Sequence, residues 1–394
     1  MTIKIDNEVN KISKNIIEWR RHIHTYPELG MELPKTAEFV AEKLSTWGID
    51  VQTEIGISGV VGKIKGSESG PTIALRADMD ALPMQETSNV TYRSKHQNIM
   101  HACGHDGHTA MLLGAAKVLS QNKEHLKGSV RFIFQPGEEG YFGAKHMIQD
   151  GCLEGVDEIY GIHLWNYQPY GEVGVKPGPI LAAADKFIIN VKGVGGHGAA
   201  PQGTVDAVVV GSHLVNSFQS IVSRNTNPIE SAVVTVGKFQ SGNNFNIISD
   251  TAELIGTTRA YKEEVREMIV EKMNDIISGT EKMYGAEIKM DYQKGYPPTV
   301  NADLPYKNIM SAAQKIVGEN AREPYLSMGA EDFSYFSQKV PGLYFSLGVN
   351  KKNVTGLQPG NHSPYFTIDD NALDQGLKSL VYLTLDYPET LKKE

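Results

Sequence analysis

The sequence contains little cysteine, with only two such residues among 394. Two cysteines cannot form the disulfide framework of a small secreted protein, and a Cys103–Cys152 bridge is not expected in a reducing compartment. No uninterrupted apolar run approaches the ~18 residues of a membrane-spanning helix. The opening "MTIKIDNEVNKISKN" has neither the apolar stretch nor the small-residue cleavage site of a secretory signal. We therefore predict a cytoplasmic protein that does not bind membranes.

Long basic runs are also absent from the sequence. Lys and Arg number 38 against 46 Asp and Glu, and the formal net charge is -8. A mildly acidic chain of this kind is a poor candidate for binding nucleic acid or an anionic membrane. Hydrophobic residues make up 40% and charged residues 21%, as in ordinary globular proteins, and the length allows two or three domains.

The two ends of the chain together predict an α/β domain, to which the C-terminal end contributes a strand, "GLYFSLGV", and a final helix from about residue 371. Apolar residues recur at helical spacing in three segments, residues 8–24, 34–48 and 109–119. Four segments rich in β-branched and aromatic residues predict strands, residues 59–66, 71–79, 128–135 and 157–164. Strands that alternate with helices, with polar residues gathered after the strand ends, are typical of an α/β core whose site lies beyond one edge of the sheet.

A different pattern begins near residue 184. Up to residue 296 the predicted elements follow the order β-α-β-β-α-β, which is the ferredoxin-like pattern. Proline and glycine at 176–179 and 296–298 mark hinges on either side. We therefore predict that residues 184–296 form an inserted α+β domain, and that residues 1–183 and 297–394 form one discontinuous main domain.

Potential metal ligands occur in four motifs of the main domain. They are Cys103 and His105 in "ACGHDG", Glu138 and Glu139 in "PGEEG", His163 in "GIHLW" and His362 in "GNHSPYF". Cysteine, histidine and carboxylate are the usual ligands of zinc and related ions. With one of the two glutamates counted as a ligand, five ligands exceed the three of a typical mononuclear catalytic site, so the pattern favours two ions that share a water molecule. His101 and His108 flank the first ligands and are candidates to support them.

The two adjacent glutamates can divide the work. Successive residues of an extended segment point to opposite sides, so one glutamate can bind metal while the other acts as a general base.

Other interpretations of these motifs do not involve a dinuclear enzyme. A Glu-Glu pair is usually a solvated turn, and a histidine at a strand end is usually structural. A thiol enzyme that uses Cys103 would leave the other motifs unexplained, and a non-catalytic metal-binding protein would need no second glutamate.

Seven motifs between residues 76 and 364 resemble those of a known family. They are "RADMDALP", "HACGHDGH", "QPGEEG", "GIH", "GVGGHGAAP", "MGAEDFSYF" and "GNHSP". The chain resembles the hippurate hydrolase-like amidohydrolases, a branch of the aminoacylase and carboxypeptidase metallopeptidase family that cleaves N-acyl amino acids. The resemblance covers essentially the whole chain. It implies a zinc-peptidase-like catalytic domain with a central mixed sheet, and a ferredoxin-like insert that serves as lid and dimerisation domain.

The resemblance also implies roles for residues of the main domain. Two divalent ions, Mn²⁺ or Zn²⁺ with Co²⁺ or Ni²⁺ also possible, would be held by Cys103, His105, Glu139, His163 and His362. Glu138 would be the general base and acid that acts on the shared water. The wider family has a metal-binding histidine followed two places later by an aspartate, where this chain has Asp78 and Asp80. Asp80 is predicted to orient a ligand histidine, and Asp78 has no predicted role.

Four further residues are implied to contact the substrate. The family's equivalent of His197 reaches the active site of the partner subunit in a homodimer and stabilises the oxyanion. Asn246 and Arg259 match positions that bind the substrate carboxylate, and the backbone of Gly329 would lie near the substrate. The expected reaction is hydrolysis of the amide bond of N-acetyl, N-benzoyl or similar N-acyl amino acids. The alternative is a metallo-dipeptidase or aminopeptidase, for which the sequence identifies no group to hold a free α-ammonium.

Overall fold

The computed structural model of the chain describes residues 4–303, 306–351 and 359–385. The chain forms two compact units. The first contains Met1–Ile180, Val300–Leu326 and Asp332–Glu394, and the second contains Leu181–Thr299 and Ser327–Glu331. The predicted insert, residues 184–296, lies within the second unit. The short segment Ser327–Glu331, which also belongs to the second unit, was not expected from the sequence.

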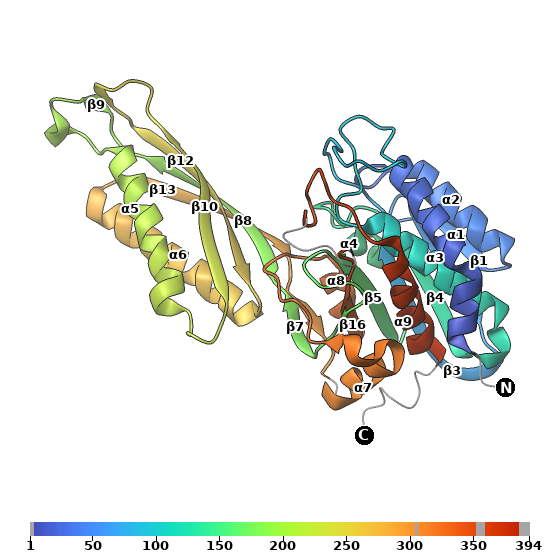
Figure 1. Ribbon diagram of the computed structural model, residues 1–394. Helices are drawn as coiled ribbons and strands as arrows, with labels where there is room; N and C mark the ends of the chain where they lie inside the picture. Colours follow the sequence, from blue (N-terminus) through green and yellow to red (C-terminus); the bar gives the residue numbers. More distant parts are fainter. Residues whose placement is uncertain (1–3, 304–305, 352–358, 386–394) are drawn as a thin grey trace. The chain divides into compact units, whose positions relative to one another are not determined.

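A mixed sheet of eight strands forms the centre of the first unit (Figure 1). In spatial order its strands are β1 (Asp50–Ile55), β2 (Gly59–Lys65), β4 (Lys127–Gln135), β3 (Glu68–Asp78), β5 (Glu158–Trp165), β16 (Gly342–Gly348), β6 (Val173–Gly174) and β15 (Ala321–Arg322). The central strands β4, β3, β5 and β16 run parallel, whereas β1, β2 and β6 introduce antiparallel pairs. The predicted mixed sheet is therefore confirmed, and the carboxyl ends of its central strands meet at one edge.

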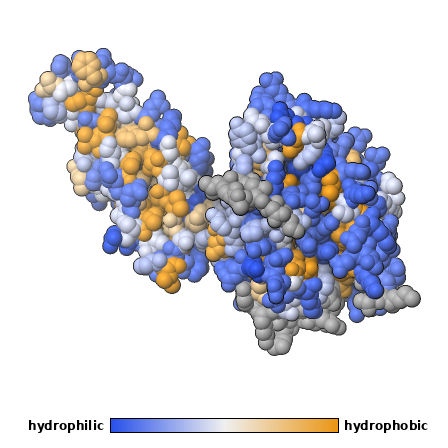
Figure 2. All heavy atoms as spheres, viewed as in Figure 1, coloured by the Kyte–Doolittle hydropathy of each residue, from blue (hydrophilic) through white to orange (hydrophobic). Residues whose placement is uncertain are grey.

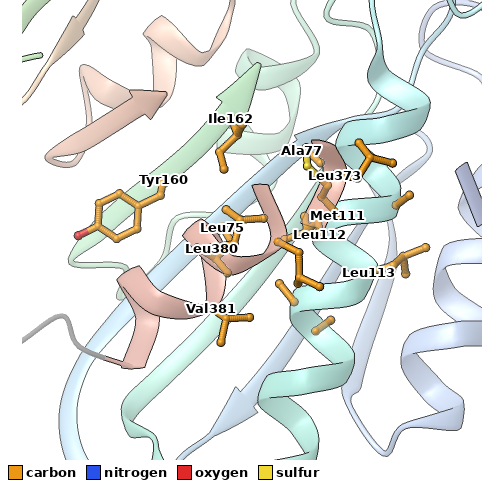
Figure 3. Packing of buried hydrophobic residues seen from close by; sticks show 14 of the residues in the cluster. Leu75, Ala77, Met111, Leu112, Leu113, Tyr160, Ile162, Leu373, Leu380 and Val381 are labelled. Atoms are coloured by element: carbon orange, nitrogen blue, oxygen red, sulfur yellow. The ribbon is translucent and has the colours of Figure 1, made fainter. Parts of the chain in front are cut away.

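Helices cover both faces of this sheet. They are α1 (Ile5–Thr25), α2 (Pro34–Thr46), α3 (His105–Gln121), α4 (Gly143–Gln149), α7 (Tyr306–Val317), α8 (Phe333–Ser337) and α9 (Leu373–Leu385). Leu75 and Ala77 of β3 face α3 and α9, where Met111 and Leu373 are packed beside them (Figure 3). Arg76 points to the opposite face because strand side chains alternate, and there it bonds to Asp332 at the start of α8.

Helix α3 is buried around most of its circumference. It packs against α1, α9 and β3, and its buried residues run without interruption from His105 to Ala116. The partner helix α1 is amphipathic instead, and it buries an apolar stripe that includes Ile12, Ile16 and Ile23. The first turn of α3 is consequently held on all sides. Among the described residues, no helix has both the length and the apolar character needed to cross a bilayer.

The second unit has a four-stranded antiparallel sheet in the order β10-β12-β8-β13. Its elements follow the predicted β-α-β-β-α-β order: β8 (Ala183–Lys192), α5 (Ala207–Ser220), β10 (Ala232–Ser241), β12 (Thr251–Ala260), α6 (Glu263–Tyr284) and β13 (Glu287–Tyr296). Two small pairs were not predicted: β9 (Gly196–His197) with β11 (Ile247–Ile248) in this unit, and β7 (Gly178–Leu181) with β14 (Thr299–Asn301), whose residues belong mostly to the first unit. Figure 1 shows β9 at one end of the second unit.

A buried ion pair joins the sheet of the second unit to α6. Arg266 Nε donates to Oδ2 of Asp185 at 2.8 Å, and the Tyr292 hydroxyl donates to the same oxygen at 2.7 Å. The backbone N–H of Gly295 donates to Oδ1 at 2.8 Å. Burial opposes ionisation of Asp185, but the hydrogen bonds from Arg266, Tyr292 and Gly295 hold its pKa below the usual value. The carboxylate therefore stays charged and fully bonded in the folded chain.

Candidate metal centre and active site

The five predicted metal ligands converge at the carboxyl edge of the central strands. His163 lies near the end of β5, and Glu139 lies in the turn that follows β4. Cys103 and His105 lie at the start of α3, where Gly104 adopts a left-handed backbone with φ 99°. His362 comes from a loop before α9. The five ligands are thus held by four different parts of the first unit.

The ligand atoms form two groups that share Cys103. One group is Cys103, His105 and His163, and the other is Cys103, Glu139 and His362; within each group the ligand atoms lie within 4.8 Å of one another. The Cys103 sulfur lies 3.5 Å from His163 Nε2 and 3.3 Å from His362 Nε2. His362 Nε2 lies 3.2 Å from Glu139 Oε1. Cys103 is therefore placed to serve two ions at once.

Hydrogen bonds fix which ring nitrogen of His105 and of His163 faces the ligand groups. His105 Nδ1 lies 2.8 Å from the carbonyl oxygen of Asp80, and His163 Nδ1 lies 2.9 Å from that of Leu164. A carbonyl only accepts, so both Nδ1 atoms carry the proton and both Nε2 lone pairs face the ligand group. His105 Nε2 is buried with no hydrogen-bond partner in the described part of the chain. A buried acceptor without a donor is rare, and this one fits a divalent metal ion.

The charges around these atoms favour a bound cation. Burial opposes protonation of His105, yet the nearby Asp78 and Cys103 raise its pKa well above the usual value. Burial also opposes ionisation of Glu139, but neighbouring histidines hold its pKa low. Burial, with Glu139 adding to it, raises the pKa of the Cys103 thiol, and burial lowers the pKa of His163 well below its usual value. A Cys103 thiolate there needs a positive partner, which a metal ion would supply.

Asp80 holds the two adjacent glutamates through their backbone. Its Oδ1 accepts the N–H of Glu138 at 3.0 Å, and its Oδ2 accepts the N–H of Glu139 at 3.0 Å. The turn needs Gly137, which has φ 64° and whose Cβ would lie 2.2 Å from the sulfur of Met31. The sequence suggested that Asp80 orients a ligand histidine, but the structure divides its contacts. Its carbonyl accepts from His105 Nδ1, and its Oδ1 also lies 3.4 Å from that nitrogen, while the carboxylate fixes the backbone of the glutamates as well.

The carboxylates of both glutamates border His105. Glu138 Oε2 lies 3.9 Å and Glu139 Oε1 4.0 Å from His105 Nε2. Glu138 is 6% exposed. Because Glu139 also belongs to the group with Cys103 and His362, it is the better placed of the two as a ligand. Glu138 lies beside the ligands and is not a member of the group with Cys103 and His362.

Asp78, for which the sequence indicated no role, belongs to a buried network. Its Oδ1 lies 2.5 Å from His108 Nδ1, and Arg76 donates to its Oδ2 at 2.7 Å. The backbone N–H of Leu164 donates to His108 Nε2 at 2.9 Å, so the proton of this ring is on Nδ1. With both nitrogens engaged, His108 has no lone pair for metal, although its atoms lie close to Asp78 and His105. It fixes the end of β5 instead.

The predicted substrate-contacting residues lie at two ends of the second unit. His197 pairs with Ile247, and the carbonyl of Asn246 accepts a backbone N–H from the residue after His197 at 2.9 Å. Arg259 lies near the other end, eight residues along β12 from Thr251, or roughly 26 Å at the strand rise. The structure therefore brings His197 and Asn246 together, and it separates both from Arg259 within one chain.

Gly329 lies at the same end of the second unit as Arg259. Its carbonyl accepts the N–H of Ala182 at 2.8 Å, and Ser327 accepts the Tyr261 hydroxyl at 2.9 Å. Arg259 is half-buried, and its guanidinium donates to the carbonyl of Thr258 at 2.9 Å. Within a single chain, Asn246 and Arg259 are therefore too far apart to bind the same carboxylate together.

His197 presents a hydrogen-bond donor at its exposed side. The backbone N–H of Ala199 donates to His197 Nδ1 at 3.0 Å. Since that nitrogen accepts, the neutral ring carries its proton on Nε2. An exposed N–H of this kind is the donor that a developing oxyanion requires.

Aromatic rings lead from His163 to the surface of the first unit. The ring centroid of Trp165 lies 4.4 Å from that of His163, and Tyr167 lies 5.5 Å from Trp165. Tyr325 stacks on Tyr167 at 5.4 Å, and these two tyrosines are 50% and 49% exposed. Our sequence analysis missed this row. The signal was present, because residues 163, 165 and 167 alternate as the residues on one side of a strand do.

The sequence matches peptidase family M20/M25/M40 over residues 74–386. The chain belongs to this family. A Bacillus subtilis protein named as an amidohydrolase, YhaA, is 44% identical over 386 residues, which are 98% of this chain and 97% of that protein. The N-acetyl-L-cysteine deacetylase of Bacillus subtilis is 39% identical over 376 residues, 95% of this chain and 89% of that protein.

Solved structures agree with the family assignment. The crystal structure of Bacillus subtilis YxeP, described as a dinuclear metal-binding peptidase of the M20 family, is similar with a TM-score of 0.84 at 33% identity. The match covers 97% of this chain and 100% of that chain. Other relatives are named thermostable carboxypeptidase and IAA-amino acid hydrolase. The predicted resemblance and fold class are confirmed, and this M20-family chain is a hydrolase of amide bonds.

Proposed function

We propose that this M20-family chain hydrolyses the amide bond of N-acyl amino acids at a centre of two divalent ions. The observation that carries the proposal is the sharing of Cys103 by two groups of buried ligands, with the carboxylate of Glu138 at their border. A relative described as dinuclear and another named as a deacetylase support it. A thiol enzyme would have no use for the other four ligands.

The residues present would hold both ions. Cys103, His105 and His163 would bind one, and Cys103 with Glu139 and His362 would bind the other. Bound divalent ions polarise a carbonyl and lower the pKa of water to about 7. The thiolate favours Zn²⁺, while histidine and carboxylate also suit Mn²⁺, Co²⁺ and Ni²⁺.

Glu138 moves the proton in this proposal. Its backbone is anchored on Asp80, and its nearly buried carboxylate faces the same space as His105 Nε2. It takes a proton from the attacking water and delivers it to the leaving nitrogen, so the products are an amino acid and a carboxylic acid. A positioned carboxylate of this kind contributes about 10²–10⁴-fold to the rate.

We also propose a homodimer that forms through the second unit. Exposed apolar side chains lie on α5, on the π-helical turn Ile221–Asn225 that follows it, and on β10 and β11: Val208, Val209, Val222, Phe239 and Ile247. Figure 2 shows apolar surface over this unit. β10 is an edge strand, which offers unpaired backbone groups to a second copy. In such a dimer His197 of one chain would donate its Nε2 proton to the oxyanion formed in the other.

Complementation tests the shared site. Glu138→Gln and His197→Ala chains should each be nearly inactive alone. A mixed dimer contains one site with both native groups, so mixing the two variants should restore part of the activity. Mixed dimers that form and stay inactive would contradict a role for His197 in the partner's site.

Substrate recognition in this proposal rests on two sets of residues. By family resemblance, Asn246, Arg259 and the backbone of Gly329 hold the carboxylate end of the substrate. The rings of Trp165, Tyr167 and Tyr325 offer an apolar wall beside His163 for the acyl group. We therefore expect aromatic acyl groups as well as acetyl to be accepted.

The substrate class is tested by amino-acid release. Chelator-treated protein would be assayed with and without Mn²⁺ or Zn²⁺ on N-acetyl, N-benzoyl and indole-acetyl amino acids and on matched free dipeptides. The proposal expects metal-dependent cleavage of the acylated compounds. Cleavage of dipeptides alone would instead support the alternative, a metallo-dipeptidase or aminopeptidase, which needs a group to hold the free α-ammonium of its substrate.

A further inference from the structure

We propose that Asn361 is a positioning residue that joins the loops of the metal centre, and that loss of its side-chain amide weakens the binding of both ions. Asn361 precedes the ligand His362 in the chain and is half-buried. It is not itself a ligand. Its proposed role is to hold three ligand-bearing segments in register.

The amide of Asn361 bonds to both of the other segments. Its Nδ2 donates to the carbonyl oxygen of Cys103 at 3.0 Å and to that of Leu164, the residue after the β5 ligand, at 3.0 Å. Its Oδ1 accepts the backbone N–H of Asn166 at 3.3 Å. Both amide hydrogens and the oxygen are thereby used. A single side chain therefore connects segments that are 258 and 197 residues away in the sequence.

The loop that carries His362 needs such support. His362 has φ 65°, a left-handed conformation that is strained for a residue with a Cβ and persists where neighbours hold it. Its N–H donates to the carbonyl of Ala102 at 2.8 Å. The side chain of Asn166 holds both flanks of the same loop, through the carbonyls of Pro359 at 2.9 Å and Thr367 at 2.8 Å.

Asn361 also acts on the tautomer of His163. The carbonyl of Leu164 accepts both Asn361 Nδ2 and His163 Nδ1, the latter at 2.9 Å, and its two lone pairs allow this. Because the partner of the distal nitrogen orients a metal-binding histidine, a Leu164 peptide that rotates would misdirect His163 Nε2. Cys103 belongs to both ligand groups, so a shift of its segment disturbs both ions.

Two variants of Asn361 test the hydrogen bonds that its amide donates apart from the one that it accepts. Asn361→Ala removes all three hydrogen bonds without adding charge. Asn361→Asp keeps an acceptor for Asn166 but supplies no donor for the two carbonyls. Both should reduce metal affinity by about 10–100-fold, the usual loss when a partner behind a metal ligand is removed.

Asn301 provides a matched control. It lies on β14, donates to the carbonyls of Lys176 at 2.8 Å and Tyr344 at 3.1 Å, and accepts the N–H of Tyr344 at 2.6 Å. It thus uses its amide in the same way, but neither partner is a proposed ligand or adjoins one in the sequence. Asn301→Ala should lower thermal stability without lowering metal affinity.

The experiment is a Co²⁺ titration of chelator-treated full-length protein, followed by calorimetry and by the thiolate-to-Co²⁺ absorption band. Circular dichroism of the metal-free variants checks that they are folded. Wild-type protein and Asn301→Ala should bind two ions with equal affinity, and the two Asn361 variants should bind more weakly with a reduced band. Wild-type affinity and band in both Asn361 variants would overturn the role, as would an equal loss in Asn301→Ala.

The inference rests on the proposed metal centre, and the same titration separates the two claims. A wild-type protein that binds no Co²⁺ would overturn the centre and the role together. A wild-type protein that binds two ions, beside Asn361 variants that bind them equally well, would overturn only the role of Asn361.

Discussion

His362 Nε2 lies 3.3 Å from the sulfur of Cys103, although 259 residues separate the two in the sequence. No local element joins them. Cys103 is placed by the start of α3 and His362 by a loop after β16, so their meeting depends on the assembly of the central sheet. The candidate centre is therefore a product of the whole first unit, and its ligands can be tested one by one.

Cys103→Ser should lose metal. A serine hydroxyl does not provide the soft thiolate that both ligand groups share, so we expect affinity to fall by at least about 100-fold, the upper range for supporting residues alone. Metal content after dialysis measures this. Cys152→Ser is the control, because burial raises the pKa of that thiol to about 12 and it lies in neither ligand group. Full metal content in Cys103→Ser would contradict the shared-ligand arrangement.

Metal should stabilise the folded chain. The buried Nε2 of His105 has no hydrogen-bond partner among the described residues, and an ion that binds only the folded state would satisfy it. At free metal about 100-fold above Kd, the stabilisation is about 2.7 kcal/mol. Calorimetry with Zn²⁺ and with chelator should show a higher Tm with metal, and Cys103→Ser should lose this shift. The same Tm in both conditions would count against the site.

The Asp185–Arg266 pair predicts acid sensitivity of the second unit. The pKa of Asp185 is lowered in the folded chain. Its stabilising contribution is therefore complete above the unfolded pKa of about 3.9 and is lost as pH falls through the folded value. Asp185→Asn should cost about 3–5 kcal/mol at pH 7, because it leaves Arg266 without its buried charge partner.

Urea unfolding at neutral and acidic pH measures this effect. Asp291→Asn on β13 is the control, since that carboxylate is exposed and its loss should change stability by at most about 0.5 kcal/mol. The difference between the two variants should shrink as pH falls below the unfolded value. Equal stability of the two at pH 7 would show that the buried pair has no such role.

Tyr325→Ala should raise KM for substrates with an aromatic acyl group more than for those with an acetyl group. Tyr325 stacks on Tyr167 in the row of rings that begins beside His163. An aromatic contact contributes about 0.5–1.5 kcal/mol, so KM for an N-benzoyl substrate should rise about 2–10-fold. KM for the matching N-acetyl substrate should hardly change, which makes it the internal control. An equal rise for both would place the acyl group elsewhere.

The ligands could be singled out from the sequence because each lies in a short motif on a predicted loop or strand end of the α/β domain. Their types restrict the chemistry, and the structure brings all five together. The role of Asp78 could not be predicted in this way. Its bond to His108 exists because β3 packs beside α3, and the bond from Leu164 to His108 requires β5 in place. Asn361 was missed for the same reason, since its partners are backbone carbonyls that carry no sequence signal.

The prediction of helices and strands from the sequence has the same limit. The central strands and the β-α-β-β-α-β order could be predicted because each segment is long enough to establish a period. β6, β9, β11 and β15 have two residues each, which is too few for an alternating pattern. The separation of Asn246 from Arg259 also escaped prediction, because it depends on which end of β12 each residue occupies.

The most direct test of the account is Glu138→Gln, measured for metal content and for kcat on an N-acyl amino acid. Glutamine keeps the backbone bond to Asp80 but cannot accept and deliver the proton, so two ions should remain bound while kcat falls by about 10²–10⁴-fold. The neighbouring Glu139→Gln should instead lose metal, as a proposed ligand. Near-normal turnover by metal-loaded Glu138→Gln would contradict the central claim that this carboxylate moves the proton.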